Sequence, residues 1–125
     1  MVGFKSAVTA LAEKNSNFRK VLYTAQGGQL VLMSLKAKEE IGMEVHPNVD
    51  QFFWIVKGTA NTVLNGEEGT VTEGEVLIVP RGTMHNIINA DNRCGLKLFT
   101  VYTPPNHPDG TVHKTKADAE AAHHD

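Results

Sequence analysis

The sequence predicts an all-β domain, either a closed barrel or a sandwich, with a short helix near each end. The first observation is a series of about nine short runs rich in Val, Leu, Ile and aromatic residues, separated by Gly, Pro or Asn. The second is the length of 125 residues, from which we expect one domain over residues 1–125. The third is a hydrophobic content of 41%, which suits a globular chain with one buried core.

The first element is a helix predicted over residues 6–14. Ser6 is the predicted N-cap, because its hydroxyl can accept a hydrogen bond from the first helical turn. Val8, Leu11 and Ala12 fall on one face of such a helix. A polar Asn-Ser-Asn run then ends it.

The barrel core is predicted over residues 20–103, where short apolar runs follow one another with little helical periodicity. The dipeptide Asn65-Gly66 predicts a tight type I′ hairpin within this core. The predicted strands are residues 20–24, 29–36, 45–46, 52–57, 61–64, 70–72, 76–79, 85–89 and 96–102.

The tail, residues 104–125, differs in composition and opens with three prolines in five residues, which predicts an open loop. Thr115 and Asp118 form a capping-box pattern, which predicts a small Ala-rich helix after them. His123 and His124 follow this helix, and we expect them to fray.

Charge and cysteine content exclude several classes of protein. Fourteen acidic and 12 basic residues give a formal net charge of −2, so we expect no nucleic-acid partner and no polybasic membrane contact. No apolar run has the length of a signal peptide or a membrane span, which favours a cytoplasmic protein. Cys94 is the single cysteine, so neither an intramolecular disulfide nor a Cys-rich zinc site can form.

The sharpest chemical signal is a spaced motif that ends in a histidine strand. It reads Gly74, five residues, Pro80, one residue, Gly82, two residues, His85, three residues, Asn89. A strand enters this motif, the proline and glycines favour a tight bend, and a second strand leaves from the histidine. Alternation along that second strand places its first and last residues on one face.

All five marked positions match the second motif of the cupin superfamily, which this sequence resembles. The resemblance implies a single cupin barrel, also described as a double-stranded β-helix or jelly roll, in which His85 is a metal ligand. Further segments resemble small, single-domain bacterial cupins. Cupins include enzymes, ligand binders and storage proteins, so the resemblance indicates the fold more strongly than the function.

The first cupin motif matches in part. When it is aligned on Gly58, its second histidine falls on His46, and both of these residues match the family pattern. Glu44 stands where the family has its first histidine, and Gln51 stands where it has a glutamate. Lys38 occupies the position of the opening glycine.

The resemblance therefore implies a metal-ligand set of Glu44, His46, Gln51 and His85. This set has the same total charge of −1 as the usual three imidazoles and one carboxylate, because the two departures offset each other. Glu44 and His46 are two residues apart, so an extended backbone would point both to one side. Imidazole and oxygen ligands suit one divalent transition metal, namely Zn, Mn, Fe, Co or Ni, and the lack of a thiolate argues against Cu(I).

Each of these residues also has a structural interpretation. His46 and His85 could be hydrogen-bonded core residues without a metal, and an ionised carboxylate in a barrel is costly unless paired. Gln51 could ligate directly or hydrogen-bond a metal-bound water. His107 and His113 could reach the barrel mouth with the proline-rich tail, or pack on the outside or on a partner chain.

Two functional hypotheses follow. In the first, the chain is a metal-dependent enzyme for a small oxygenated substrate, an isomerase of sugars or keto compounds or a dioxygenase, with the metal as Lewis acid. Glu44 would be the candidate catalytic base if it did not bind the metal. In the second, the barrel is a non-catalytic small-ligand binder, with or without metal. In both, the predicted pocket lining is Phe53, Ile55, Met84 and Ile87.

A purely structural module is the third interpretation, and it leaves the inward-facing polar residues without a role. The expected partners are a small-molecule ligand or substrate and, since small cupins usually pair through sheet edges, a second copy of the chain. The strands over residues 20–36 are candidates for covering an exposed edge in such a homodimer.

Overall fold

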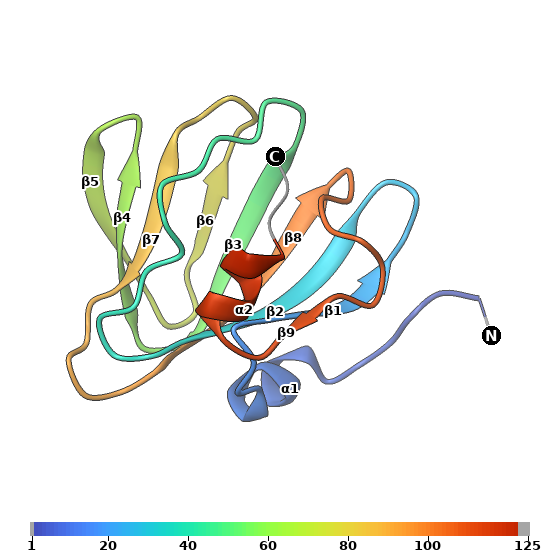
Figure 1. Ribbon diagram of the computed structural model, residues 1–125, viewed down its shortest axis with the longest axis horizontal. Helices are drawn as coiled ribbons and strands as arrows, with labels where there is room; N and C mark the ends of the chain where they lie inside the picture. Colours follow the sequence, from blue (N-terminus) through green and yellow to red (C-terminus); the bar gives the residue numbers. More distant parts are fainter. Residues whose placement is uncertain (1, 123–125) are drawn as a thin grey trace.

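Two antiparallel sheets form an all-β barrel with two short helices, as the sequence predicts (Figure 1). The computed structural model describes residues 2–122. The larger sheet has six strands in the order β6-β3-β8-β2-β1-β9, and the smaller has three in the order β5-β4-β7. The strands are β1 (Arg19–Thr24), β2 (Gln29–Leu35), β3 (Asp50–Lys57), β4 (Thr59–Leu64), β5 (Glu67–Thr72), β6 (Val76–Val79), β7 (His85–Asn89), β8 (Leu96–Thr103) and β9 (Val112–His113).

The helices are α1 (Val8–Lys14) and α2 (Lys116–Ala121). The predicted capping of α2 is confirmed, because the Thr115 hydroxyl accepts a hydrogen bond from the Asp118 amide at 3.0 Å. The prediction of Ser6 as the cap of α1 is wrong, since Ala7 occupies that position and no side chain caps the helix. No helix within residues 2–122 has the length and apolar character needed to cross a membrane.

The predicted strands agree with the structure except in two places. The segment 45–46 forms no regular strand, because the backbone of the chain before β3 pairs with β7 only in isolated bridges, at Glu40 and Glu44. The short strand β9 lies in the tail, where we predicted a loop. The hairpin at Asn65-Gly66 is confirmed, with φ values of 49° and 83° that match a type I′ turn. The expectations for His123 and His124 lie outside the described residues.

The apolar core lies between the two sheets and is built by alternation along the strands. Strand β8 buries every second residue, and β3 turns Gln51, Phe53 and Ile55 inward, as predicted. Phe53 and Ile55 join a cluster of buried apolar side chains from both sheets. The inward-facing residues on β3, β7 and β8 also include the polar side chains of Gln51, His85 and Thr100, so part of the interior is polar.

Asn89, the last residue of the second motif, has a structural role. Its side-chain amide donates to the carbonyl oxygens of Leu35, Lys36 and Cys94, and its Oδ1 accepts from the Asp91 amide. The side chain is buried, so it joins the end of β7 to the end of β2 and to the turn before β8. These contacts hold the smaller sheet against the larger one at this end of the barrel.

We predict that Asn89→Ala lowers the free energy of unfolding by about 2–4 kcal/mol, because it leaves several buried backbone groups without partners. Urea denaturation followed by circular dichroism measures the change. Asn92→Ala, in the neighbouring exposed turn, is the matched control and should change stability by less than about 0.5 kcal/mol. Equal stability of the two variants would contradict this role for Asn89.

Candidate metal centre

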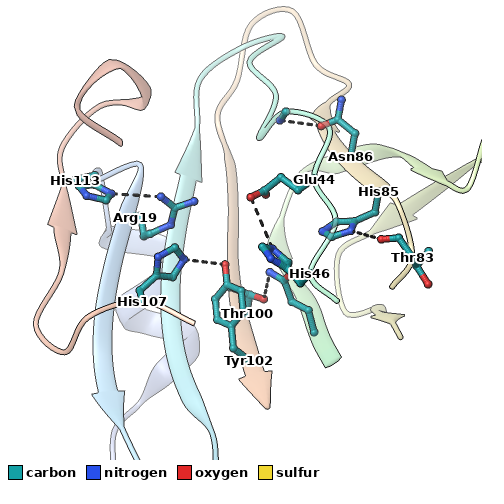
Figure 2. Close-up of polar contacts among 12 residues, drawn as sticks. Arg19, Glu44, His46, Thr83, His85, Asn86, Thr100, Tyr102, His107 and His113 are labelled. Atoms are coloured by element: carbon teal, nitrogen blue, oxygen red, sulfur yellow. Dashed lines mark hydrogen bonds and ion pairs between the residues drawn. The ribbon is translucent and has the colours of Figure 1, made fainter. Parts of the chain in front are cut away.

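Three of the four predicted metal ligands meet inside the barrel (Figure 2). One ligand atom each from Glu44, His46 and His85 lies within 4.8 Å of the other two. Glu44 and His46 come from the segment before β3, and His85 begins β7. We refer to these three residues as the ligand trio.

Backbone hydrogen bonds set the position of the ligand trio. The Glu44 amide donates to the His85 carbonyl at 2.8 Å, and the His85 amide donates to the Glu44 carbonyl at 2.9 Å. The Gly82 amide donates to the His46 carbonyl at 2.9 Å. Gly82 has a φ of 81°, a conformation that glycine adopts without strain, which explains its place in the motif. The bend before β7 therefore fixes the position of His85, which follows it, and of the segment that contains Glu44 and His46.

The tautomer of His85 is fixed by its surroundings. Its Nδ1 lies 2.9 Å from the carbonyl oxygen of Thr83, and a carbonyl oxygen can only accept, so Nδ1 carries the proton. The other ring nitrogen, Nε2, then carries a lone pair. It is buried and has no hydrogen-bond partner within residues 2–122, in a residue that is 2% exposed. A histidine that donates one ring nitrogen to a carbonyl and presents the other as a lone pair is the usual arrangement of a metal ligand.

Like the His85 ring, the side-chain amide of Gln51 uses its donor in a hydrogen bond within the protein and leaves its acceptor without one among the described residues. The Thr100 hydroxyl donates to the Phe52 carbonyl at 2.8 Å, so it accepts from the Gln51 amide nitrogen at 3.0 Å. This leaves the Gln51 Oε1 as a buried acceptor with no hydrogen-bond partner in the described part of the chain, on a side chain that is 2% exposed. The predicted fourth ligand therefore faces the barrel interior with its oxygen available.

These groups fit a divalent cation. The carboxylate of Glu44 lies 3.7 Å from the His46 Nε2, and the lone pairs of His85 and Gln51 add two further buried acceptors. Buried acceptors without donors are costly, and a metal ion would satisfy them together. Metal–ligand bonds of about 2.0–2.2 Å would require the ligand atoms of the trio, now within 4.8 Å of one another, to move closer together.

Tyr102 on β8 adjoins the ligand trio and was not identified from the sequence. Its ring meets the His46 ring edge-on at 6.0 Å. Burial raises the pKa of Tyr102 to about 12, and the Glu44 carboxylate acts in the same direction, whereas Arg19 and Gln51 oppose the rise. The phenol is therefore neutral at ordinary pH and available as a hydrogen-bond donor.

The tail returns to the barrel and brings two further histidines inward. His107 places its Nε2 3.2 Å from the Tyr102 hydroxyl, and the Gln29 side chain holds the His107 backbone. His113 accepts at Nδ1 from the Arg19 guanidinium at 3.3 Å (Figure 2). The sequence left open whether these residues reach the barrel mouth or pack on the outside, and the structure has His107 beside the buried Tyr102.

A cavity of about 390 Å³ opens beside the ligand trio, and Glu44 is part of its wall. It is lined by Phe18, Arg19, Ile41, Gly42, Met43, Glu44, Lys116, Ala119 and Glu120. The predicted pocket residues lie elsewhere. Phe53, Ile55 and Ile87 are buried in the core, with the Phe53 ring against that of His85, and Met84 is 48% exposed. Strand alternation identifies inward-facing residues but not those at the open end of a barrel, and none of the four predicted residues lines this cavity.

Comparison with known proteins gives consistent results. The model of the family described as "Cupin domain" matches residues 31–102. The chain is similar to the uncharacterized protein YrkC of Bacillus subtilis, with 44% identity over 92% of this chain, and to the uncharacterized protein L612 of Acanthamoeba polyphaga mimivirus, with 46% identity over 79%. It spans 64% of the length of each of these relatives. The crystal structure of BH2720 from Bacillus halodurans superposes with a TM-score of 0.92 and 38% identity, over 95% of this chain and 94% of that one.

We predict that Arg19→Met raises the pKa of His113. That pKa lies below the ordinary value of 6.5, first because burial disfavours the charged ring and second because of the adjacent guanidinium, while Asp118 acts in the opposite direction. A depressed histidine pKa favours the neutral form, so its contribution to stability is present above pH 6.5 and is lost as the pH falls below it.

The measurement is an NMR titration of the His113 ring protons. The matched control is Lys20→Met, which removes an exposed charge from the same strand and should leave the His113 titration unchanged. A His113 pKa that does not move in Arg19→Met would show that the guanidinium has no electrostatic effect on this ring.

Proposed function

The chain belongs to the cupin domain family, and on this basis we propose that Glu44, His46 and His85 bind one divalent transition-metal ion, with Gln51 as a further oxygen ligand. We propose that the centre is enzymatic and acts on a small oxygenated substrate. The candidate reactions are isomerisation of a sugar or keto compound and dioxygenation. Zn, Mn, Fe, Co and Ni all suit the ligand chemistry.

One observation carries this proposal. Lone pairs and a carboxylate converge in the barrel, and the donors of His85 and Gln51 are already used elsewhere. The Nδ1 proton of His85 goes to Thr83, and the amide hydrogens of Gln51 face Thr100. A site that was only structural would be expected to pair these acceptors with donors. The arrangement is preorganised for a cation instead.

A bound metal ion would supply Lewis acidity to a substrate carbonyl or hydroxyl oxygen. The residues of the chain would do the rest. Glu44 belongs both to the ligand trio and to the cavity wall, so a substrate in the cavity would lie against its carboxylate. We assign Glu44 primarily as a ligand. The neutral phenol of Tyr102 can donate a hydrogen bond, and burial of His85 and Gln51 excludes water from the inner side.

A non-catalytic ligand-binding cupin is the second candidate, and one observation favours it. Glu44 and the exposed Glu120 are the carboxylates among the residues that line the cavity. If Glu44 is committed to the metal, no buried base remains on this wall, among the described residues, to accept a substrate proton. Turnover of a bound compound would distinguish the enzyme from the binder.

We propose a second copy of this chain as the macromolecular partner. Phe52, Trp54, Val76 and Ile78 lie on the outer face of β3 and β6 and are 37% to 51% exposed. Phe52 pairs with Ile78 and Trp54 with Val76 in the strand register, so the four side chains are contiguous. A single apolar patch of this kind is self-complementary, which favours a two-fold symmetric dimer. A cytoplasmic location remains a prediction from the sequence.

We predict that the purified chain holds about one divalent metal ion per chain and that His46→Ala and His85→Ala each lower its metal affinity roughly tenfold or more. Glu44→Gln should also weaken binding, because it removes the only charge of the set. Elemental mass spectrometry and competition with a chelator give the stoichiometry and the affinity. His123 and His124 are replaced by alanine in every variant, since consecutive histidines can hold stray metal.

The matched control is His113→Ala, which removes a histidine that contacts Arg19 outside the ligand trio and should keep its metal. Retention of full metal affinity in His85→Ala would exclude the site. Full metal content together with lost turnover in Glu44→Gln would instead identify Glu44 as a base.

We predict that the chain sediments as a dimer and that Trp54→Glu with Ile78→Glu converts it to a species of about half the mass. The charges would be buried without partners in the proposed interface. Analytical ultracentrifugation measures the mass. Val112→Glu, at an equally exposed apolar position on β9, is the control and should remain dimeric. A monomeric parent protein would rule out the interface.

A further inference from the structure

Arg19 is a buried cation without an anionic partner within residues 2–122. The residue is only 7% exposed, and its Nε has no hydrogen-bond partner in this part of the chain. Neither ion pair among the described residues involves it. Its side-chain contacts include the Phe18 ring, at 5.3 Å from the guanidinium carbon, and the His113 Nδ1 at 3.3 Å.

These contacts orient the guanidinium without neutralising its charge. The His113 Nδ1 accepts from one terminal nitrogen, which requires a neutral ring, and the Phe18 ring has no formal charge. A buried guanidinium that lacks an anion is costly, and removing the cost requires a negative group at its open side. The unpartnered Nε marks the edge of the guanidinium that can form a two-point contact with such a group.

The cavity joins this cation to the ligand trio. Arg19 and Glu44 both line it, from β1 and from the segment beside β7 respectively. Tyr102, whose ring meets the His46 ring edge-on at 6.0 Å, also has Arg19 and Glu44 among the charges that act on its hydroxyl. The volume of about 390 Å³ is near the lower end of the range of about 300–1,000 Å³ for small-molecule sites. One small ligand could therefore contact both ends.

We propose that this cavity binds a small organic acid, whose carboxylate pairs with Arg19 while a neighbouring carbonyl or hydroxyl oxygen faces the ligand trio. This inference rests on the proposed function and narrows its substrate class. A neutral sugar would leave the Arg19 charge uncompensated, whereas an oxo or hydroxy acid satisfies both the cation and the metal centre. Lys116, which is partly exposed on the cavity wall, adds a positive charge that attracts an anionic ligand to the cavity.

The choice of arginine supports a carboxylate as the anion. The guanidinium is planar and presents paired donors that match the two oxygens of a carboxylate. At the Arg19 end of the cavity, one buried arginine balances the single charge of a carboxylate, whereas a phosphate dianion paired there would need a second cation beside it. Lys116 is not at that depth, because it is partly exposed.

The test compares two probes that differ in charge and little in shape, pyruvate and its uncharged amide, pyruvamide. Isothermal titration calorimetry with the metal-loaded full chain should show binding of pyruvate and binding of pyruvamide that is weaker by roughly tenfold or more. Arg19→Met should weaken pyruvate binding roughly tenfold or more and remove the preference over pyruvamide. Arg19→Lys keeps the charge but loses the paired donors, so its affinity should be intermediate.

Two controls separate a direct contact with Arg19 from a general effect of charge and from loss of metal or of folding. Lys20→Met removes an exposed charge from the neighbouring position on β1 and should change the affinity by less than about twofold. Metal content and thermal unfolding are measured in each variant, and Arg19→Met should retain its metal because Arg19 is not a ligand.

The outcomes distinguish this inference from the proposed function. A protein that holds its metal but binds pyruvate and pyruvamide equally, or binds pyruvate equally in Arg19→Met, contradicts the organic-acid assignment and leaves the metal centre standing. If inorganic phosphate competes with pyruvate more strongly than acetate does, the assignment of a carboxylate as the anion is also contradicted. A protein that holds no metal, yet prefers pyruvate over pyruvamide only when Arg19 is present, supports the anion site and contradicts the metal centre.

Discussion

The pair of backbone hydrogen bonds between Glu44 and His85 is the constraint on which the site depends. It joins an irregular segment to the first residue of β7, on the smaller sheet. Without it, Glu44 and His46 would lie on a connection that has no regular pairing of its own. With it, two residues from that connection and one from β7 present their side chains to one volume. The distance between the ligand atoms is thus set by the backbone rather than by flexible side chains.

His85 and Gln51 direct their N–H donors to oxygen atoms of the protein and leave an acceptor in the barrel interior that is unpaired within the described part of the chain. The Thr83 carbonyl accepts a hydrogen bond from the His85 ring. The Thr100 hydroxyl accepts one from the Gln51 amide nitrogen and donates its own to the Phe52 carbonyl. Each buried acceptor left over costs about 1–3 kcal/mol in the absence of a partner. The apolar cluster between the sheets and the hydrogen bonds of Asn89 offset this cost, so the unpaired acceptors of the candidate metal centre are a local destabilisation that the rest of the fold compensates.

The fold and the convergence of the three candidate ligands could be predicted because they are encoded locally. Alternation reports which strand residues face inward, and the bend before His85 requires glycine at a positive φ. A positive φ also occurs at Lys38, the position where the cupin motif has glycine. Its φ is 61°, so the lysine adopts the backbone conformation for which the family uses glycine. Arg19 and Tyr102 could not be found in this way, because they adjoin the site through the pairing of β1, β2 and β8, which are distant in the sequence. The cavity wall was missed because it includes α2, whose position no local pattern specifies.

Charge accounts for the relation between the two ends of the cavity. The acceptor set carries one negative charge, so a divalent ion in it would leave a net charge of +1 at that end, and Arg19 places a second positive charge at the other. Two positive charges inside a small barrel repel each other and raise the cost of burying either one. An anionic ligand between them relieves both costs at once. The buried guanidinium and the buried acceptors therefore favour the same occupant, a small molecule with one charged and one polarised oxygen group.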